Sequence, residues 1–478
     1  MTTLCTRCRS QLPQIQDTLG KPNNRSQLRS RLAELDTLID TLTAERRRLQ
    51  AASDLIVYPV LSLPTEITSK IFQYTLLSIP RPSPPEAPLL LTQICREWRA
   101  IAVNDHHLWQ SILFEDIGSL ELLNLWLSRS GNLPLSYSLL SSDPAQAESL
   151  LEASILHAHR WQDVTLTLPL PTFAKLEINQ INLPVLRKIS LAIRSATYTG
   201  VVTFGNTITI QNAPLLLEAH VTTIPHVQFD LPWPQLTTLT LRHNVEFSDC
   251  LSLLEHCPEL VNLEISITDP GVPAIPPAPL THHSMQCLTL NSMTLLEYLS
   301  LPRLQQLTVS QDIEFRHAAA LESFMRRSAC ILRVLSLLIS YIAPDALRAC
   351  LRAVPDSVVD LELAWWVLDE RSAIFNILTT DILPDLATLR LSGRYLSPAE
   401  FGTLLDVLRA RHAGGVLRSF TLRLDVFLSV PNVRVRPGIS TIERFRTLAA
   451  EGLKIKMILV LSGSENISVV TLLESSTG

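Results

Sequence analysis

The chain has 478 residues, of which 46% are hydrophobic and only 18% charged, so it can bury a large core. Its net charge of −5 argues against a nucleic-acid binder that works by neutralising phosphates. No apolar run approaches the ~18 residues of a membrane span, and the eight dispersed cysteines are typical of reduced thiols. We therefore expect a cytoplasmic or nuclear protein without a membrane segment.

Residues 1–25 are expected to form a flexible tail, with a glycine, a proline and paired asparagines near its end. The tail contains a lone C-x-x-C pair, Cys5 and Cys8. Structural zinc takes four ligands, and no second pair lies nearby. We expect no metal here unless a partner chain completes the site, and no other motif indicates a cofactor.

Residues 26–57 are predicted to be a coiled-coil helix. Its apolar residues follow a heptad pattern, with Leu28, Leu35, Leu42 and Leu49 seven apart and Leu32 and Ile39 between them. Arg46 takes the next alternate position, where the pattern weakens. About three heptads are marginal alone, so this helix either forms a parallel dimer or packs against the following part of the chain.

The pattern from residue 62 to residue 113 has two apolar stripes at helical spacing. Pro64 suits a first helical turn, because its missing N–H costs nothing there. The first stripe consists of Leu63, Ile67 and Ile71, which lie four residues apart. The second stripe consists of Leu90, Ile94, Trp98, Ile101 and Ala102. Helices this small bury little surface alone and need cover from the rest of the chain or from another protein.

These residues resemble the F-box, and more closely the F-box-like variant common in mushroom-forming fungi (basidiomycetes). The matching residues are Leu63, Pro64, Glu66, Ile67, Ile71, Phe72, Ile94, Cys95, Arg96, Trp98, Arg99, Ile101, Ala102, Leu108 and Trp109. The chain departs from the family at Asp105-His106-His107, where a Thr-Pro step is usual. That departure leaves the geometry of the turn open.

The resemblance implies an F-box-like domain over residues 58–115 that docks the Skp-type adaptor of SCF ubiquitin ligases. Carried over by position, the adaptor-binding residues are Leu63, Pro64, Ile67, Ile94 and Trp98. The alternative is that the two helices are ordinary buried elements of a larger domain. Cys95 is interpreted as a small buried apolar residue.

A proline-rich stretch separates the two stripes. Residues 79–88 hold five prolines, which remove hydrogen-bond donors and block a helix interior. We expect an extended loop there, with some polyproline character.

From residue 111 onward the predicted strands and helices alternate, which is typical of parallel strands with crossover helices. We expect strands at 111–114, 133–140 and 163–168, and helices at 118–130 and 145–159. A short pattern, apolar-x-x-apolar-x-apolar, then recurs eleven times. The eleven triplets begin at Trp161, Phe173, Leu186, Leu236, Leu260, Met285, Leu304, Leu332, Val358, Leu386 and Leu417.

From Leu236 onward the triplets are 19 to 31 residues apart, a spacing typical of leucine-rich repeats. The resemblance is to the degenerate repeats that follow fungal F-boxes. The predicted fold class is therefore α/β: a coiled-coil helix, a small helical F-box, and an irregular leucine-rich-repeat solenoid with parallel strands over residues 116–478. A loop insertion is expected at 269–279, a last helix at 440–451, and a terminal capping strand at 453–461.

In such a stack the residues between the buried leucines line the concave side. The candidate target-binding residues are Glu264, Glu362, Trp365, Arg390 and Arg423. Of the adjacent Trp365 and Trp366, one faces away from the core and either anchors a target or packs under a loop.

No phosphate loop, nucleophile elbow, metal helix or dinucleotide fingerprint is present, so the sequence gives no sign of catalysis. The favoured hypothesis is a substrate-recognition subunit of an SCF-type cullin–RING ubiquitin ligase, which holds the Skp-type adaptor through its F-box and an unknown protein substrate through its repeats. The alternative is a ligase-independent scaffold that the coiled coil joins into a homodimer. An unrecognised hydrolase is disfavoured by the missing motifs.

Overall fold

The fold comes from a computed structural model of the chain. It describes residues 25–54, 59–77, 79–116, 119–174, 181–194, 207–210, 212–222, 228–268, 278–310, 315–339, 344–365, 371–378, 381–393, 396–427, 437–462 and 467–474. The chain divides into two compact units, residues 1–71 and 72–478. Residues 1–24 of the predicted tail, with Cys5 and Cys8, and residues 269–277 of the predicted insertion at 269–279 lie outside the described residues.

The first unit is helical. It contains α1 (Arg25–Asp54), the 3₁₀ turn η1 (Pro59–Ser62) and most of α2 (Thr65–Tyr74). The helix predicted from residue 26 is confirmed as far as Asp54, while its predicted end at 55–57 lies outside the described residues. The Pro64 carbonyl accepts the N–H groups of Ile67 and Thr68, each at 3.1 Å, and so starts α2.

The second predicted F-box helix is interrupted. It consists of α3 (Leu91–Ile94) and α4 (Arg96–Asn104), and Cys95 between them has an extended backbone with φ −152°. The Cys95 sulfur accepts the Trp98 N–H at 3.4 Å and caps α4. The prediction that Cys95 is a buried apolar residue was wrong, because it is partly exposed and serves as a cap.

The proline-rich loop is folded into turns rather than extended. The Ser83 carbonyl accepts the Glu86 N–H at 3.0 Å, and the Glu86 carbonyl accepts the Leu90 N–H at 2.8 Å. The Pro80 carbonyl accepts the Leu113 N–H at 2.9 Å, which ties the loop to the first strand of the sheet. The predicted polyproline extension was therefore wrong, because local backbone hydrogen bonds and a partner strand organise the loop.

Within the described residues of the second unit, fifteen strands form one sheet in chain order. They are β1 (Ser111–Glu115), β2 (Leu135–Leu140), β3 (Trp161–Leu168), β4 (Lys188–Ile193), β6 (Glu218–Thr222), β8 (Thr238–Val245), β9 (Asn262–Ile267), β11 (Cys287–Leu290), β13 (Gln306–Val309), β14 (Val334–Ile339), β15 (Asp360–Trp365), β16 (Thr388–Gly393), β17 (Ser419–Phe427), β18 (Lys454–Ser462) and β19 (Ile467–Glu474). Neighbouring strands are parallel except β18 and β19, which are antiparallel.

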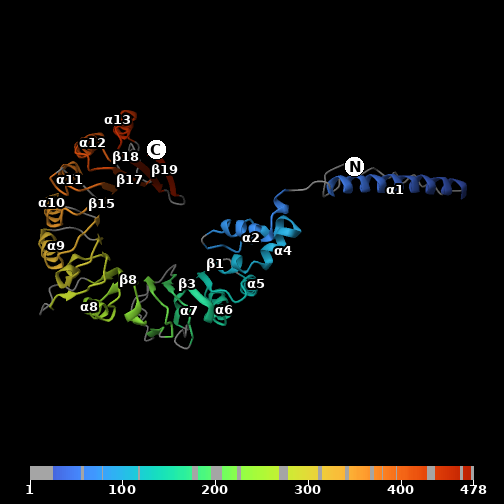
Figure 1. The fold of residues 1–478 in the computed structure, drawn as a ribbon, viewed down its shortest axis with the longest axis horizontal. Coiled ribbons are helices and arrows are strands. Elements are labelled where there is room, and N and C mark those ends of the chain that lie inside the picture. Colours follow the sequence, from blue (N-terminus) through green and yellow to red (C-terminus); the bar gives the residue numbers. More distant parts are fainter. Residues whose placement is uncertain are drawn as a thin grey trace. The chain divides into compact units, whose positions relative to one another are not determined.

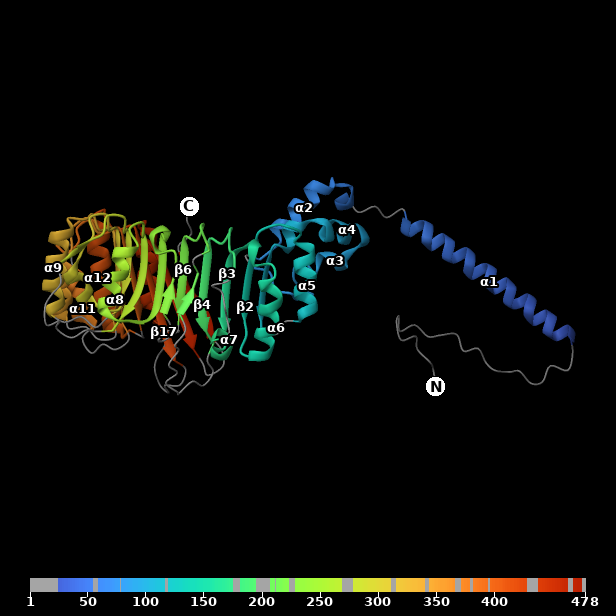
Figure 2. The same cartoon turned by 90° about the horizontal axis from the view of Figure 1, so that it is seen from below.

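Two short strand pairs lie beside this sheet, β5 (Thr207–Thr209) with β7 (Gln228–Asp230), and β10 (Leu280–Thr281) with β12 (Leu299–Ser300). The connecting helices and 3₁₀ turns are η2 (His106–Trp109), α5 (Leu120–Arg129), α6 (Pro144–Ile155), η3 (Ala158–Arg160), α7 (Leu170–Ala174), η5 (Trp233–Gln235), α8 (Phe247–His256), η6 (Met293–Tyr298), α9 (Phe315–Ser328), α10 (Pro344–Ala353), α11 (Arg371–Ile377), α12 (Pro398–Ala413) and α13 (Ile439–Ala450). Within the second unit the sheet curves, with the strands on the inner side and α8 to α13 on the outer side (Figure 1). The strands run side by side across the stack (Figure 2).

The repeated leucines form the core of this sheet. Leu361 lies opposite Leu389 in the strand register, and Leu363 lies opposite Leu391, and all four are buried. The pattern missed β6, whose buried core includes Ala219 where the template expects a large residue.

Two predictions about the strands need correction. Phe173 lies in α7 rather than in a strand, because its apolar spacing also fits a buried helix, and the rest of its triplet lies outside the described residues. The strand predicted at 453–461 is β18, which is not the last one, because β19 pairs with it on its far side. The predicted last helix at 440–451 is confirmed as α13.

Two buried arginines and one half-buried arginine connect successive layers to one another. The Arg160 guanidinium donates to the Leu133 carbonyl at 2.9 Å, and that of Arg327 donates to the Leu296 carbonyl at 2.7 Å. The guanidinium of Arg411 is buried and donates to the carbonyls of three residues of the preceding layer, Leu378, Ile382 and Leu383. Each arginine therefore satisfies loop carbonyls some 27 to 33 residues earlier in the chain.

We expect Arg411→Met to loosen the C-terminal layers, because it keeps the aliphatic stem but leaves buried carbonyls without a donor. Unsatisfied buried acceptors cost roughly 2–5 kcal/mol together. Hydrogen exchange of the β16 and β17 amides measures this local loss. Arg409→Met on the same helix is the matched control, because its side chain is 47% exposed and lies 3.9 Å from Asp406. Equal exchange in both variants would contradict the fastening role.

Candidate interaction surfaces

The α2 segment carries one row of uncovered aliphatic side chains. Leu63, Ile67 and Ile71 are 39%, 50% and 44% exposed, and Pro64 beside them is also exposed. Aliphatic groups of this size gain roughly 1.5–3 kcal/mol each on full burial. Covering this row with another apolar surface would therefore be favourable.

The α3–α4 segment carries a second apolar surface. Leu90 and Ile94 are 41% and 52% exposed. Trp98 is only partly exposed, because its ring packs on Phe72 with centroids 4.9 Å apart. Of the predicted adaptor-binding residues in this segment, Ile94 thus presents an open apolar group, whereas Trp98 also supports the fold.

A tryptophan joint connects α4 to the sheet. The Trp109 indole N–H donates to the Ala102 carbonyl at 2.8 Å, and its ring meets the Trp126 ring edge-on with centroids 4.7 Å apart. The Arg129 guanidinium lies 4.4 Å from the centroid of the Trp109 ring. Both tryptophans are buried, so α4, β1 and α5 pack around one shared core.

The turn that departs from the family pattern is closed by Asp105. Its carboxylate accepts the His107 N–H at 3.0 Å and the Gln73 amide at 3.1 Å, and η2 follows directly. The His106 ring bonds the Arg129 carbonyl at 2.6 Å. An aspartate cap therefore stands in place of the Thr-Pro step, and the turn that it starts positions Trp109 in the tryptophan joint.

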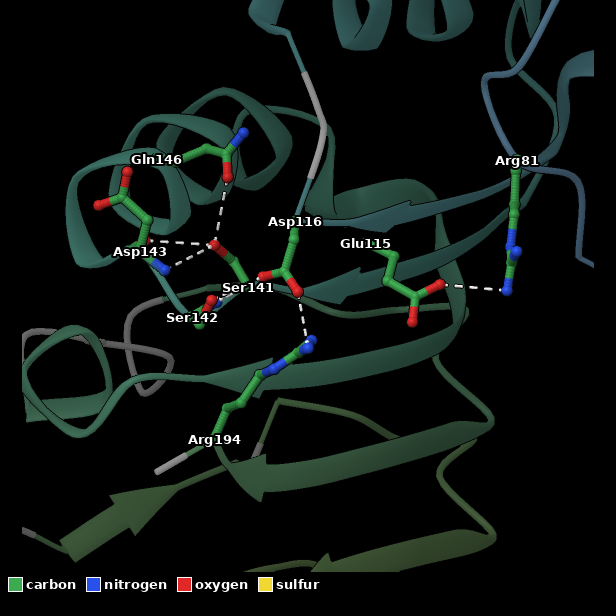
Figure 3. Close-up of polar contacts among 8 residues, drawn as sticks. All are labelled: Arg81, Glu115, Asp116, Ser141, Ser142, Asp143, Gln146 and Arg194. Carbon is green, nitrogen blue, oxygen red and sulfur yellow. Dashed lines mark hydrogen bonds and ion pairs between the residues drawn. The ribbon is translucent and has the colours of Figure 1, made fainter. Parts of the chain in front are cut away.

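A polar latch lies where β1, β2 and β4 end. The Asp116 carboxylate accepts the N–H and the hydroxyl of Ser142, both at 2.9 Å, and pairs with Arg194 at 2.6 Å (Figure 3). Beside it, Arg81 of the proline-rich loop pairs with Glu115 at 3.1 Å. These contacts join the loop and three strands that are far apart in sequence.

The Ser142 donors lower the pKa of Asp116 below its ordinary value, and the Arg194 guanidinium adds to this shift. Asp116 has φ +47°, a left-handed conformation that aspartate, asparagine and glycine tolerate best. Both its charge and its backbone therefore suit this position.

We expect Asp116→Ala to destabilise this end of the sheet by about 1 kcal/mol, a figure reduced for the solvent exposure of the latch. Asp116→Asn should cost less, because it tolerates the backbone and still accepts from Ser142. Since folding lowers the pKa of Asp116, its contribution is present above the unfolded carboxyl pKa of ~3.9 and is lost as pH falls through the lowered folded value. Urea unfolding against pH measures this, and the asparagine variant should lose the dependence that Asp116 adds.

The face of the sheet opposite the leucines is a continuous polar row. Strand register aligns Thr240, Glu264, Thr289, Thr308, Ser336, Glu362, Arg390 and Thr421 on consecutive strands from β8 to β17. Three of the predicted target-binding residues, Glu264, Glu362 and Arg390, lie in this row. Arg423 lies two residues further along β17.

Internal partners already neutralise most of these charges. Glu264 pairs with Arg242 at 2.7 Å, Arg390 with Asp360 at 2.7 Å, and Arg423 with Asp425 at 3.1 Å.

Glu362 differs from these three, because within the described part of the chain it accepts from the Ser336 hydroxyl at 3.2 Å rather than from a cation. Burial raises the pKa of the neighbouring Asp360, and Glu362 raises it further, whereas Arg390 opposes both. The backbone of Trp365 ends β15, whereas its side chain and residue 366 lie outside the described part of the structure.

The described residues show little sign of a reactive centre. Burial raises the pKa of Cys250 and Cys257 to about 12 and that of Cys350 to about 11, so these thiols stay protonated and unreactive at neutral pH. Among the described residues no three His, Cys, Asp or Glu side chains gather as a metal site. In the same part of the chain, the search for membrane spans found no helix with the required length and apolarity.

Comparison with protein families places these surfaces in context. The family described as F-box-like matches residues 60–115, which contain α2, α3, α4, η2 and β1. A search of the curated proteins found no match for the chain. The family match supports an F-box protein with a general substrate-adaptor role in SCF ligases, and such proteins are typically adaptors rather than enzymes.

Proposed function

We propose that the chain is the substrate-recognition subunit of an SCF-type cullin–RING ubiquitin ligase and is not itself an enzyme. The observation that carries the proposal is that the helices matched as F-box-like each expose aliphatic side chains, with Ile67 of α2 at 50% and Ile94 of α3 at 52% exposure. Leu63, Pro64, Ile67, Ile94 and Trp98 would contact the Skp-type adaptor, and Trp98 would also hold α4 on Phe72.

The sheet would be an irregular leucine-rich-repeat solenoid that binds the target protein. Its chain-order parallel strands, buried leucines and polar row support this assignment. Glu362 is the favoured target contact, because among the described residues it accepts from Ser336 and has no internal ion pair that a target cation would displace. Glu264, Arg390 and Arg423 would bind a target only in exchange for their present partners, and Trp365 stays a further candidate.

The mechanism would be proximity. Holding a target beside the adaptor raises the effective concentration of its lysines near the ligase-bound ubiquitin donor. The tryptophan joint supports this role, because the buried pair Trp109 and Trp126 limits movement between α4 and the first strands. A fixed distance between α4 and the first strands would then limit which target lysines are reached.

The double variant Ile67→Glu with Ile94→Glu tests adaptor docking. We expect it to weaken binding of the Skp-type adaptor at least about a hundredfold, because two apolar contacts are lost and two charges are desolvated. Isothermal titration with purified adaptor gives the affinity. Leu156→Glu is the matched control, since this leucine is 78% exposed and lies outside the matched segment. Unchanged affinity in the double variant, with a native circular dichroism spectrum, would refute these contacts.

A ligase-independent scaffold is the alternative, and the exposed leucines of α1 favour it as a joining element. Proteasome inhibition separates the two functions in cells. A ligase subunit predicts that proteins bound by the wild-type chain accumulate on inhibition, and that they are already elevated with the Ile67→Glu/Ile94→Glu variant. A scaffold predicts no change in either case. Quantitative mass spectrometry of the captured proteins measures the difference.

A further inference from the structure

Helix α1 is a long helix whose apolar seam has no cover. Every described side chain from residue 25 to residue 52 is exposed. The aliphatic residues among them are between 41% and 61% exposed: Leu28, Leu32, Leu35, Leu38, Ile39, Leu42 and Leu49. A seam at heptad spacing fits another helix of the same period better than a sheet or a groove.

The order of residues along the seam favours one of the two possible directions of pairing, parallel or antiparallel. In a parallel, in-register dimer each residue meets its own copy, so Arg46 would face Arg46 of the second copy inside the seam. Two guanidinium groups would then repel each other in a partly desolvated position. The parallel arrangement therefore has a like-charge layer between Leu42 and Leu49.

The antiparallel arrangement removes this clash. Because the seam reads nearly the same in both directions, Leu32 meets Leu42 of the second copy, and Leu35 meets its Ile39. These contacts occur twice by symmetry and give four consecutive aliphatic layers. Arg46 then lies opposite Leu28, near the end of the seam, where its stem covers the leucine and its charge reaches water.

The flanking positions also favour this direction. Arg31 lies beside Glu45 of the second copy, an opposite-charge pair that occurs twice. Leu38 meets Leu38 of the second copy at the two-fold axis and extends the apolar contact. One contact opposes the antiparallel arrangement, because Asp36 lies beside Asp36 of the second copy and the two carboxylates repel each other. In the parallel arrangement the corresponding attraction would be between Arg31 and Asp36.

We propose that α1 pairs with α1 of a second copy of this chain as an antiparallel coiled coil. The partner is a second copy because the seam and its flanking charges complement themselves. The helix spans about 45 Å at 1.5 Å per residue, so the two copies of Asp54, from which each chain continues to its F-box-like segment, lie at opposite ends of the coil. The pairing therefore holds the two copies of Asp54 apart rather than side by side.

Charge variants of the full-length chain test the direction of pairing, with dissociation constants from sedimentation equilibrium. Glu45→Arg should weaken the antiparallel dimer on the order of tenfold, because two attractive contacts become repulsive. Adding Arg31→Glu restores opposite charges and should return the affinity to within about threefold of wild type. Asp36→Ser should tighten the dimer a few-fold, because it removes the facing aspartates.

The parallel dimer makes the opposite predictions, because Glu45 would face Gln50 and Asp36 would face Arg31. Weakening by Asp36→Ser together with no effect of Glu45→Arg would overturn the antiparallel assignment. A wild-type chain that stays monomeric at all concentrations would overturn the homodimer, since its own residues would then cover the seam. Adaptor titration of the same variants should be unchanged, because α1 lies outside residues 60–115. The failure of this proposal is therefore distinguishable from failure of the proposed function.

Discussion

The alternation of leucine and polar residues along parallel strands is the constraint on which the second unit depends. A strand such as β15 places Leu361 and Leu363 on the buried side and Glu362 between them on the other side. Because each strand is covered by its neighbours and by the segment that connects it to the next strand, the same alternation recurs from layer to layer. One pattern thereby creates the core and the polar row at once.

Side-chain packing at the start of the sheet joins the first strand to helices α4 and α5. Trp109, Trp126 and Arg129 fill one core, while Asp116 and Arg194 close the polar edge of the same layers. The first strand follows η2 without a linker. Helices α3 and α4 and the polar row of the sheet are therefore parts of the same compact unit, which begins at residue 72.

Much of the fold could be predicted from the sequence, because burial leaves a periodic trace. The spacing of leucines predicted β8 to β17 and the helix α1, and two matched halves predicted the F-box-like segment. Prediction failed where a single residue departed from the repeat template or interrupted a helix. Ala219 is too small to match the template, Phe173 fits helix and strand alike, and Cys95 interrupts a helix by capping the next one.

The ion pairs of the polar face could not be predicted for a different reason. Arg242 and Glu264 meet only because neighbouring strands align, and that register is a property of the sheet rather than of either segment. The same holds for the latch at Asp116, whose partners lie 26 and 78 residues away. A backbone conformation at φ +47° left no signal that periodicity could detect.

The alternation has a consequence for how such a protein changes during evolution. Glu362 and Thr289 of the polar row lie outside the buried core, so under the proposed function their replacement would alter target binding at small cost to folding. The leucines between them tolerate far less. Under the proposed function, residues that set target specificity alternate with residues that form the core, so specificity can change while the fold stays the same.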